Sequence, residues 1–299
     1  MVCQTTKLSE SGQRKEVCCY AIAMRRKLLF IAVLAGTATA GLESWSTPQK
    51  ERFLATATIT TETAAGKGIT NSKKATLTDG RRSHFAHVQW IDVYMPLFKG
   101  KDGSEEREFK DSWKFNVAAY RLAKLLGLTS MVPASVARPV DGKPASVTWW
   151  VDNFLMDERE RVSQGIKPPD VERWNQQMDT IRVFDQLIYN MDRSQENLLI
   201  CKDWSVWMID HSRAFRKWAT LRNPAAVTHC SLELLARLKA LNRRDLERDL
   251  TPFVTAEEID GLMARRDLIV DKLEHGSSSS VEVPAKSNPV TTKTSRSRR

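Results

Sequence analysis

Three side chains, Asp192, Asn197 and Asp210, have the types and the spacing to handle a proton and a metal ion. Asp192 and Asn197 stand five positions apart, and Asp210 follows thirteen positions later, at the end of the apolar run 206–209. Phosphoryl transfer needs a carboxylate beside the acceptor hydroxyl and oxygen ligands that hold a divalent cation against the nucleotide phosphates. We therefore expect Asp192 to be the catalytic residue, and Asn197 and Asp210 to bind Mg²⁺ or Mn²⁺, which prefer oxygen ligands.

The sequence around these residues predicts a short loop followed by a tight hairpin. Residues 198–201 and 205–209 are apolar and strand-like, and a short turn joins them. Such a hairpin would return Asp210 to the loop that carries Asp192. Asp and Asn also populate ordinary turns and helix caps, so their spacing alone leaves that interpretation open. The combination of loop, hairpin and strand-ending aspartate favours phosphoryl transfer.

Strand signals dominate the chain ahead of this loop. Polar residues alternate with β-branched and aromatic ones in three segments, which we expect to be strands: 53–60, 74–78 and 84–92. Asp79-Gly80 predicts a hairpin between the last two. Gly66 and Gly68 fall between the first two, where a glycine-bearing turn would cover phosphates with backbone amides. A simple flexible turn has the same composition, and both interpretations stay open.

A further hairpin is expected before the chain turns helical. Strands over 136–140 and 146–151 flank the turn Asp141-Gly142. Trp150, near the end of the second strand, is placed to stack on an adenine ring. It could equally cover an edge of the core together with Trp149.

Helical periodicity appears once in the front half and dominates the back half. Residues 113–126 follow a charged loop, 99–111, and end at Gly127, a typical C-terminal helix signal. Further helices are expected over 174–190 and 231–241, and a last one begins with the capping box Thr255–Glu258. The pattern predicts an α+β protein with a β-rich front, 53–151, and a helical back, 152–275.

The net charge of +10 comes mainly from the two ends of the chain. Residues 1–40 and 276–299 contribute +4 each, which leaves +2 for residues 41–275. A basic balance made by the ends does not indicate a nucleic-acid-binding face, and we expect no nucleic-acid partner. The last segment, 276–299, is rich in Ser, Thr, Pro and basic residues and is expected to be a disordered basic tail.

The N-terminal region predicts export. Residues 24–40 combine a positive start, a short apolar run and an Ala-x-Ala cleavage signal, as a secretory signal peptide does. Residues 1–23 are interpreted as an upstream extension and 41–52 as a linker. The apolar run is shorter than the roughly 20 residues that span a bilayer, so we expect no permanent membrane span. The mature protein is expected in the periplasm or outside the cell.

Several motifs resemble those of atypical kinases. The helix Asn116-Val-Ala-Ala-Tyr-Arg-Leu-Ala-Lys, the loop Asn190-Met-Asp-Arg and the segment Met208-Ile-Asp-His are similar to those of HipA-type kinases, phosphatidylinositol kinases and the four-jointed kinases of the secretory pathway. The resemblance covers roughly residues 53–274. It implies a two-lobed protein-kinase-like fold with a β-rich N-lobe, 53–151, and a helical C-lobe, 152–275. It also implies ATP as a cofactor, Asp192 as the catalytic aspartate, and metal ligation by Asn197 and Asp210.

The small lobe departs from the kinase pattern at two positions. Gln89 and Asn116 stand where the resemblance implies a lysine that contacts phosphates and its glutamate partner. Amides form hydrogen bonds but cannot neutralise phosphate charge. Two function classes therefore stay open: an exported atypical kinase acting on an unknown protein or small-molecule acceptor, and a pseudokinase-like binding or scaffold protein. The candidates to replace the missing lysine are Lys67, Lys74 and Lys114.

Overall fold

The computed structural model describes residues 45–65, 72–100 and 103–275. The expected signal peptide, upstream extension and basic tail lie outside the described residues, as do Gly66, Lys67 and Gly68. Among the described residues, no helix combines the length and the apolar character needed to cross a bilayer.

A five-stranded antiparallel sheet forms the front of the described chain. Its strand order is β1-β2-β3-β7-β6. The strands are β1 (Thr58–Ala64), β2 (Lys73–Thr78), β3 (Ser83–Gln89), β6 (Ser135–Val140) and β7 (Lys143–Trp149). The hairpin expected at Asp79-Gly80 joins β2 to β3, and Gly80 has a φ of 85°, which a side chain would disfavour. Alternate residues such as Ala86 and Val88 are fully buried, so one face of the sheet forms part of the core.

Helix α1 (Thr47–Thr56) replaces part of the expected linker and the start of the expected strand over 53–60. Ser46 caps it, and the side chain of Gln49 bonds back to the backbone of Ser46, forming a capping box. The helix packs on β6 and β7. Phe53 is buried there, edge-on to Trp149 with ring centroids 6.0 Å apart. Burial against the sheet and a complete cap outweigh the β-propensity of the threonines.

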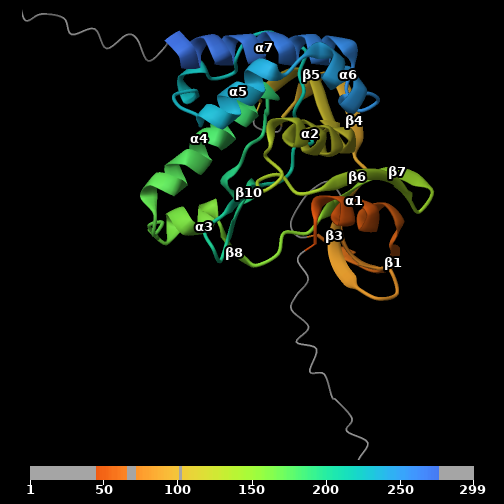
Figure 1. Cartoon of the computed structure of the whole chain (residues 1–299). Helices are drawn as coiled ribbons and strands as arrows, with labels where there is room; N and C mark the ends of the chain where they lie inside the picture. The colour runs from red at the N-terminus through yellow and green to blue at the C-terminus, as the bar shows by residue number, and fades with distance from the viewer. Residues whose placement is uncertain (1–44, 66–71, 101–102, 276–299) are drawn as a thin grey trace, which may run out of the picture. The chain divides into compact units, whose positions relative to one another are not determined.

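Helix α2 (Trp113–Leu126) forms where its periodicity predicts. Gly127 ends it in the left-handed conformation, with a φ of 72°. The helix contacts β6 and β7 on one side and the helices α5 (Leu232–Ala240) and α6 (Arg243–Leu250) on the other. Figure 1 shows α2 between the five-stranded sheet and the helices of the back half. A residue on α2 can therefore connect the front of the protein to the back.

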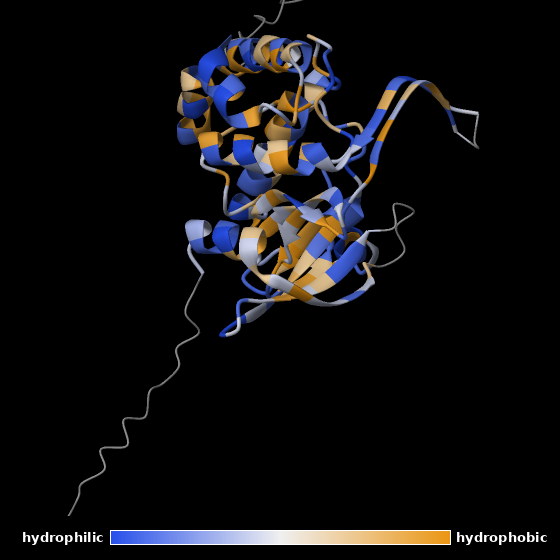
Figure 2. Cartoon of the chain, turned by 90° about the vertical axis from the view of Figure 1, so that its right-hand side faces the viewer, coloured by the Kyte–Doolittle hydropathy of each residue, from blue (hydrophilic) through white to orange (hydrophobic). Residues whose placement is uncertain are grey.

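The segment expected to be a charged loop, 99–111, contains a strand. β4 (Asp92–Lys99) and β5 (Glu105–Ser112) pair only with each other among the described residues. The expected strand 84–92 correspondingly ends at Gln89. Figure 2 shows the β4–β5 hairpin as an arm in which hydrophobic and hydrophilic residues alternate. The rings of Phe98 and Phe109 stack across it with centroids 4.5 Å apart, and this packing stabilises strands whose charges suggest a loop.

The back half is mainly helical, with a small three-stranded sheet. The sheet contains β8 (Phe154–Asp157), β9 (Leu198–Cys201) and β10 (Val206–Met208), in the order β10-β9-β8. The remaining helices are α3 (Glu158–Ser163), α4 (Val171–Leu187) and α7 (Ala256–His275), with two 3₁₀ turns at Gln195–Asn197 and Pro224–Ala226. The backbone of Thr255 bonds to Glu258 and the backbone of Glu258 to Thr255, as expected for the capping box. The sequence did not indicate the separate helix α6.

This arrangement confirms the α+β class with a β-rich front and a helical back. The division of the chain into lobes at 53–151 and 152–275 stays a prediction.

Candidate active site

The β9–β10 hairpin brings the end of β10 back to the loop that carries Asp192. Trp207 pairs with Leu199 in the hairpin register. Directly after β10, the backbone N–H of Ile209 donates to the carbonyl of Asn197 over 3.0 Å. The side-chain Nδ2 of Asn197 in turn donates to the carbonyl of Asp192, at 3.5 Å. Hydrogen bonds therefore connect Asp192 to Asn197 and Asn197 to Ile209, the residue directly before Asp210.

Asp210 has an unusual backbone conformation. Its φ of 53° lies in the left-handed region, which few residues other than glycine adopt, although Asp and Asn tolerate it better than most. The N–H of Ser212 donates to the Asp210 carboxylate at 3.4 Å. The side chain is exposed. Backbone strain at an exposed carboxylate is typical of functional sites.

Arg193 holds the loop that carries Asp192 in place, and the sequence analysis missed this role. Its guanidinium bonds both carboxylate oxygens of Asp185 on α4, at 2.9 and 3.0 Å. Its Nη1 also donates to the carbonyl of Ile209 at 2.6 Å. Both side chains of the ion pair are largely buried, with 12% and 10% exposure. Arg193 thus connects the loop that carries Asp192 to helix α4 and to Ile209, the residue before Asp210.

Gln89 and Asn116 form a buried amide pair. Asn116 Nδ2 donates to Gln89 Oε1 at 2.5 Å, and both side chains are buried. Asn116 Oδ1 accepts the backbone N–H of His211 at 2.8 Å. The two side chains therefore face each other beside the segment that follows Asp210. Their role in nucleotide binding stays a prediction.

The face of β3 that carries Gln89 also carries His87, because the two residues are two positions apart. Burial lowers the pKa of His87, and the nearby Asp210 carboxylate acts in the opposite direction. The sequence analysis did not select His87, although the period of two from Gln89 could have indicated it. His87 is thus a further polar group near Asp210, the predicted metal ligand.

Lys74 and Trp150 lie close together near His87. Lys74 pairs with His87 across β2 and β3. Its Nζ lies 4.4 Å from the centre of a Trp150 ring and 4.1 Å from that of Phe85. Of the alternative lysines, Lys114 is already paired with Asp92 at 2.8 Å. Lys74 is therefore the described lysine best placed beside the predicted stacking residue.

The end of β5 adds a carboxylate that the sequence analysis placed in a loop. Asp111 is 9% exposed, and its Oδ1 has no hydrogen-bond partner among the described residues. Burial raises the pKa of Asp111, a hydrogen bond from Ser212 lowers it, and the charge of Asp210 raises it further. Asp111 therefore sits in the electrostatic field of the predicted metal ligand.

Arg213 links the same hairpin to Asp192. Its Nη1 lies 3.8 Å from the Asp192 carboxylate, and its other terminal nitrogen pairs with Glu106 on β5. Arg216, which is buried, bonds the second carboxylate oxygen of Glu106 at 3.0 Å. Two arginines thus compensate the charge of the partly buried Glu106, and one of them approaches the predicted catalytic residue.

The donor atoms present fit a hard divalent cation. Within the described ranges, no group of three or more His, Cys, Asp or Glu side chains is close enough to hold a metal by itself. The bond from Asn197 Nδ2 to Asp192 leaves Asn197 Oδ1 as the atom available to a cation. One carboxylate and one amide oxygen would leave most coordination positions to water and phosphate oxygens, which is how magnesium is commonly bound with nucleotides.

Comparison with known proteins supports the fold. No protein-family model and no curated protein sequence matches the chain. A crystal structure of the Golgi casein kinase is similar, with a TM-score of 0.51 and 12% identity, over 79% of this chain and 76% of that one. The Helicobacter pylori proinflammatory kinase CtkA matches with a TM-score of 0.48 and 12% identity, over 77% of this chain and 99% of that one.

The fold is therefore kinase-like, and this statement rests on the first of the two structures. At such low identity the likeness concerns the fold alone. The narrower resemblance to HipA-type, phosphatidylinositol and four-jointed kinases stays a prediction.

Proposed function

We propose that this protein catalyses metal-dependent phosphoryl transfer from a nucleotide, ATP in the first instance, to a protein or small-molecule acceptor. The observation that carries the proposal is the hydrogen-bonded arrangement of Asp192, Asn197 and the segment entering Asp210. The kinase-like fold makes phosphoryl transfer the first chemistry to test at these residues.

Each residue has a distinct task in this proposal. Asp192 accepts the proton of the acceptor hydroxyl, and the Arg213 guanidinium lies 3.8 Å from its carboxylate. Asn197 and Asp210 hold Mg²⁺ or Mn²⁺, which supplies positive charge to the phosphates. Arg193 keeps the loop and the Asp210 segment in register through its bond to the Ile209 carbonyl. Catalysis here is positioning and electrostatics, as phosphoryl transfer requires.

The nucleotide would lie along the sheet face that carries Trp150, Lys74 and His87. Trp150 offers a ring for the adenine, and Lys74 offers a cation next to it. Gly66 and Gly68, which lie outside the described residues, remain the sequence candidates for covering the phosphates with backbone amides. The buried amides Gln89 and Asn116 provide no charge, so binding would depend strongly on the divalent ion.

The test compares two aspartates with the same backbone conformation. Asp210 and Asp141 are both exposed and have φ values of 53° and 52°. Asparagine tolerates this conformation, so Asp210→Asn and Asp141→Asn each remove one charge without adding strain. We expect Mg-ATP or Mn-ATP to raise the melting temperature of the wild type and of Asp141→Asn. Asp210→Asn should show little or no increase.

The outcome separates the two function classes. Equal stabilisation of all three proteins by metal-ATP would refute the assignment of Asp210. Stabilisation lost in Asp210→Asn, together with transfer of labelled phosphate to the enzyme or to added acceptors, would support the kinase proposal. A ligand present at a free concentration of 100 times its Kd stabilises the folded protein by about 2.7 kcal/mol, and thermal unfolding readily resolves a difference of this size.

A second candidate function is a pseudokinase-like binding or scaffold protein. The observation that favours it is the buried pair Gln89 and Asn116, which replaces an ion pair by neutral amides. Absence of any nucleotide-dependent stabilisation, with or without metal, would favour this function.

We further propose that the protein is exported to the periplasm or beyond the cell. The support is the sequence of residues 24–40. Intact-mass analysis after secretion from a bacterial host tests it, with a new N-terminus expected at or near Gly41.

A further inference from the structure

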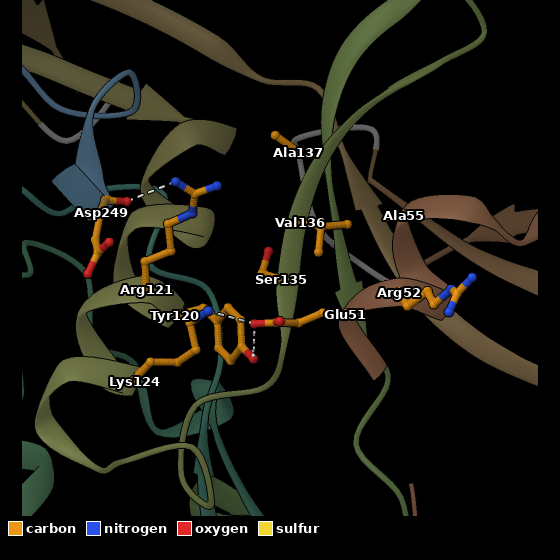
Figure 3. A pocket seen from close by; sticks show the side chains of 10 residues that line it. All are labelled: Glu51, Arg52, Ala55, Tyr120, Arg121, Lys124, Ser135, Val136, Ala137 and Asp249. Atoms are coloured by element: carbon orange, nitrogen blue, oxygen red, sulfur yellow. Dashed lines mark hydrogen bonds and ion pairs between the residues drawn. The ribbon is translucent and has the colours of Figure 1, made fainter. Parts of the chain in front are cut away.

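A pocket lies beside α2, at the free edge of the five-stranded sheet. It has a volume of about 450 Å³. Four elements contribute to it, namely α1, α2, β6 and α6. Figure 3 shows the side chains that line it: Glu51, Arg52, Ala55, Tyr120, Arg121, Lys124, Ser135, Val136, Ala137 and Asp249.

One wall of the pocket is the edge strand β6. Ser135, Val136 and Ala137 are consecutive residues, and all three line the pocket. In the part of the chain that the structure describes, β6 pairs with β7 and with no other strand. An unpaired strand edge presents N–H and C=O groups that an extended peptide can bond. The pocket therefore runs along a backbone surface suited to one more strand.

The carboxylates of the pocket already have partners. Glu51 accepts hydrogen bonds from Lys124 Nζ and from the Tyr120 hydroxyl, both at 2.8 Å. Asp249 pairs with Arg248, whose Nη2 lies 2.9 Å away. Neither acid is therefore available to balance the remaining positive charges.

Two guanidinium groups form no ion pair with an acid among the described residues. Arg121 donates to the backbone carbonyl of Asp249 at 2.9 Å, a neutral acceptor. Arg52 is exposed, and its side chain makes no hydrogen bond or ion pair among the described residues. In Figure 3, Arg121 projects from α2 and Arg52 from α1, on opposite sides of the β6 segment. A ligand along β6 would thus lie between the two helices that carry these charges.

We propose that this pocket binds an extended acidic segment of a partner protein, added as a strand along β6, with its carboxylates directed to Arg121 and Arg52. Charge complementarity selects an acidic peptide over a basic or apolar one. Backbone bonding to the β6 edge selects an extended segment over a helix. The proposal concerns a different surface from the candidate active site and stands whether or not the protein transfers phosphate.

The test is direct binding to the full chain, without any activity assay. The probe is a fluorescent peptide of about six residues, a usual strand length, that alternates glutamate and valine. Its counterpart has lysine at each glutamate position. We expect the acidic peptide to bind, with an affinity that falls as salt is raised, and the lysine peptide not to bind.

Variants locate the binding site. Arg52→Gln removes a charge that has no partner in the described fold, so it should weaken binding about two- to fivefold while leaving the circular dichroism spectrum unchanged. Arg121→Gln should weaken binding at least as much, and its own fold is checked by the same spectrum because Arg121 also packs on Phe253, 4.6 Å from the ring centre. Arg81→Gln, in the exposed β2–β3 turn, is the matched control and should bind as the wild type does.

Three results would overturn the proposal. Equal binding of the acidic and lysine peptides would remove the charge argument. Equal loss in Arg81→Gln and Arg52→Gln would mean that net charge, not this pocket, governs binding. Undiminished binding of both peptides methylated at alternate backbone nitrogens, one peptide for each alternating set, would exclude strand addition, because one of the two must lack the N–H donors that face β6.

Discussion

The ion pair between Arg193 and Asp185 is the support on which the candidate active site depends most. With 12% and 10% of the two side chains exposed, neither charge has ready access to water. Arg193→Gln would leave Asp185 with the Asn190 amide, 2.9 Å away, as its remaining side-chain partner among those described. Breaking a buried pair by removing one member costs about 3–5 kcal/mol. That is a large part of the roughly 5–15 kcal/mol by which a domain is stable.

The same helix supplies a matched control. Arg182 and Asp179 on α4 also form an ion pair, at 2.7 Å, but the arginine is 46% exposed. Loss of an exposed pair costs about 0–1 kcal/mol. We therefore expect urea denaturation to show a much lower free energy of unfolding for Arg193→Gln and almost none of this loss for Arg182→Gln, with similar dependence on urea concentration.

A double variant separates charge burial from lost hydrogen bonds. Arg193→Met with Asp185→Leu removes both charges, so the cost of an unpaired buried carboxylate disappears. Recovery should be partial, because the Ile209 carbonyl still loses its donor. The coupling free energy between the two positions is expected to be about 0.5–3 kcal/mol. Equal costs for Arg193→Gln and Arg182→Gln, or no coupling at all, would refute the structural role given to Arg193.

Three further predictions use other buried polar groups. Gln89→Lys and Asn116→Glu should each lower the free energy of unfolding, and together they should restore part of it and raise affinity for metal-ATP above either single variant, measured by denaturation and titration. Burial alone would raise the pKa of Glu51, but hydrogen bonds from α2 lower it overall. The contribution of Glu51 to the free energy of unfolding is therefore present above pH 4.5 and is lost as pH falls. Glu51→Gln should show a smaller loss of this free energy between about pH 5 and pH 3. Burial raises the pKa of Asp111, so its effect has the opposite sign, and Asp111→Asn should gain stability relative to the wild type as pH rises above about 4.

The elements with strong local signals were predictable from the sequence. The Asp79-Gly80 hairpin, the helix ending at Gly127 and the β9–β10 hairpin before Asp210 each follow from turn chemistry or periodicity within a few residues. The last of these elements also brings the Asp210 segment back to the loop that carries Asp192. The spacing of the candidate site could therefore be interpreted without knowledge of distant contacts.

The β4–β5 hairpin could not be predicted in this way, because its charges have partners far away in the sequence. Glu106 becomes compatible with a partly buried strand only through Arg213 and Arg216, which lie in the back half of the chain. The local sequence shows the charge of Glu106 but not the two distant arginines that pair with it. Helix α1 is a related case, since burial of Phe53 against Trp149 decides its conformation. Arg193 is different: Asp185 lies only eight residues before it, so the signal was present and was missed.

Asn116 shows why replacing the kinase ion pair by amides need not separate the two halves of the fold. An amide both donates and accepts, and Asn116 uses each capacity once, toward Gln89 on β3 and toward the backbone N–H of His211. A glutamate at this position could accept from a lysine and from His211 but could not donate to Gln89. The amide pair thus keeps the mechanical link from the sheet through α2 to the segment after Asp210, while it gives up the charge. If the protein binds a nucleotide as proposed, positive charge for the phosphates would come from the metal ion and from Lys74, and we therefore expect nucleotide binding to depend on the divalent ion.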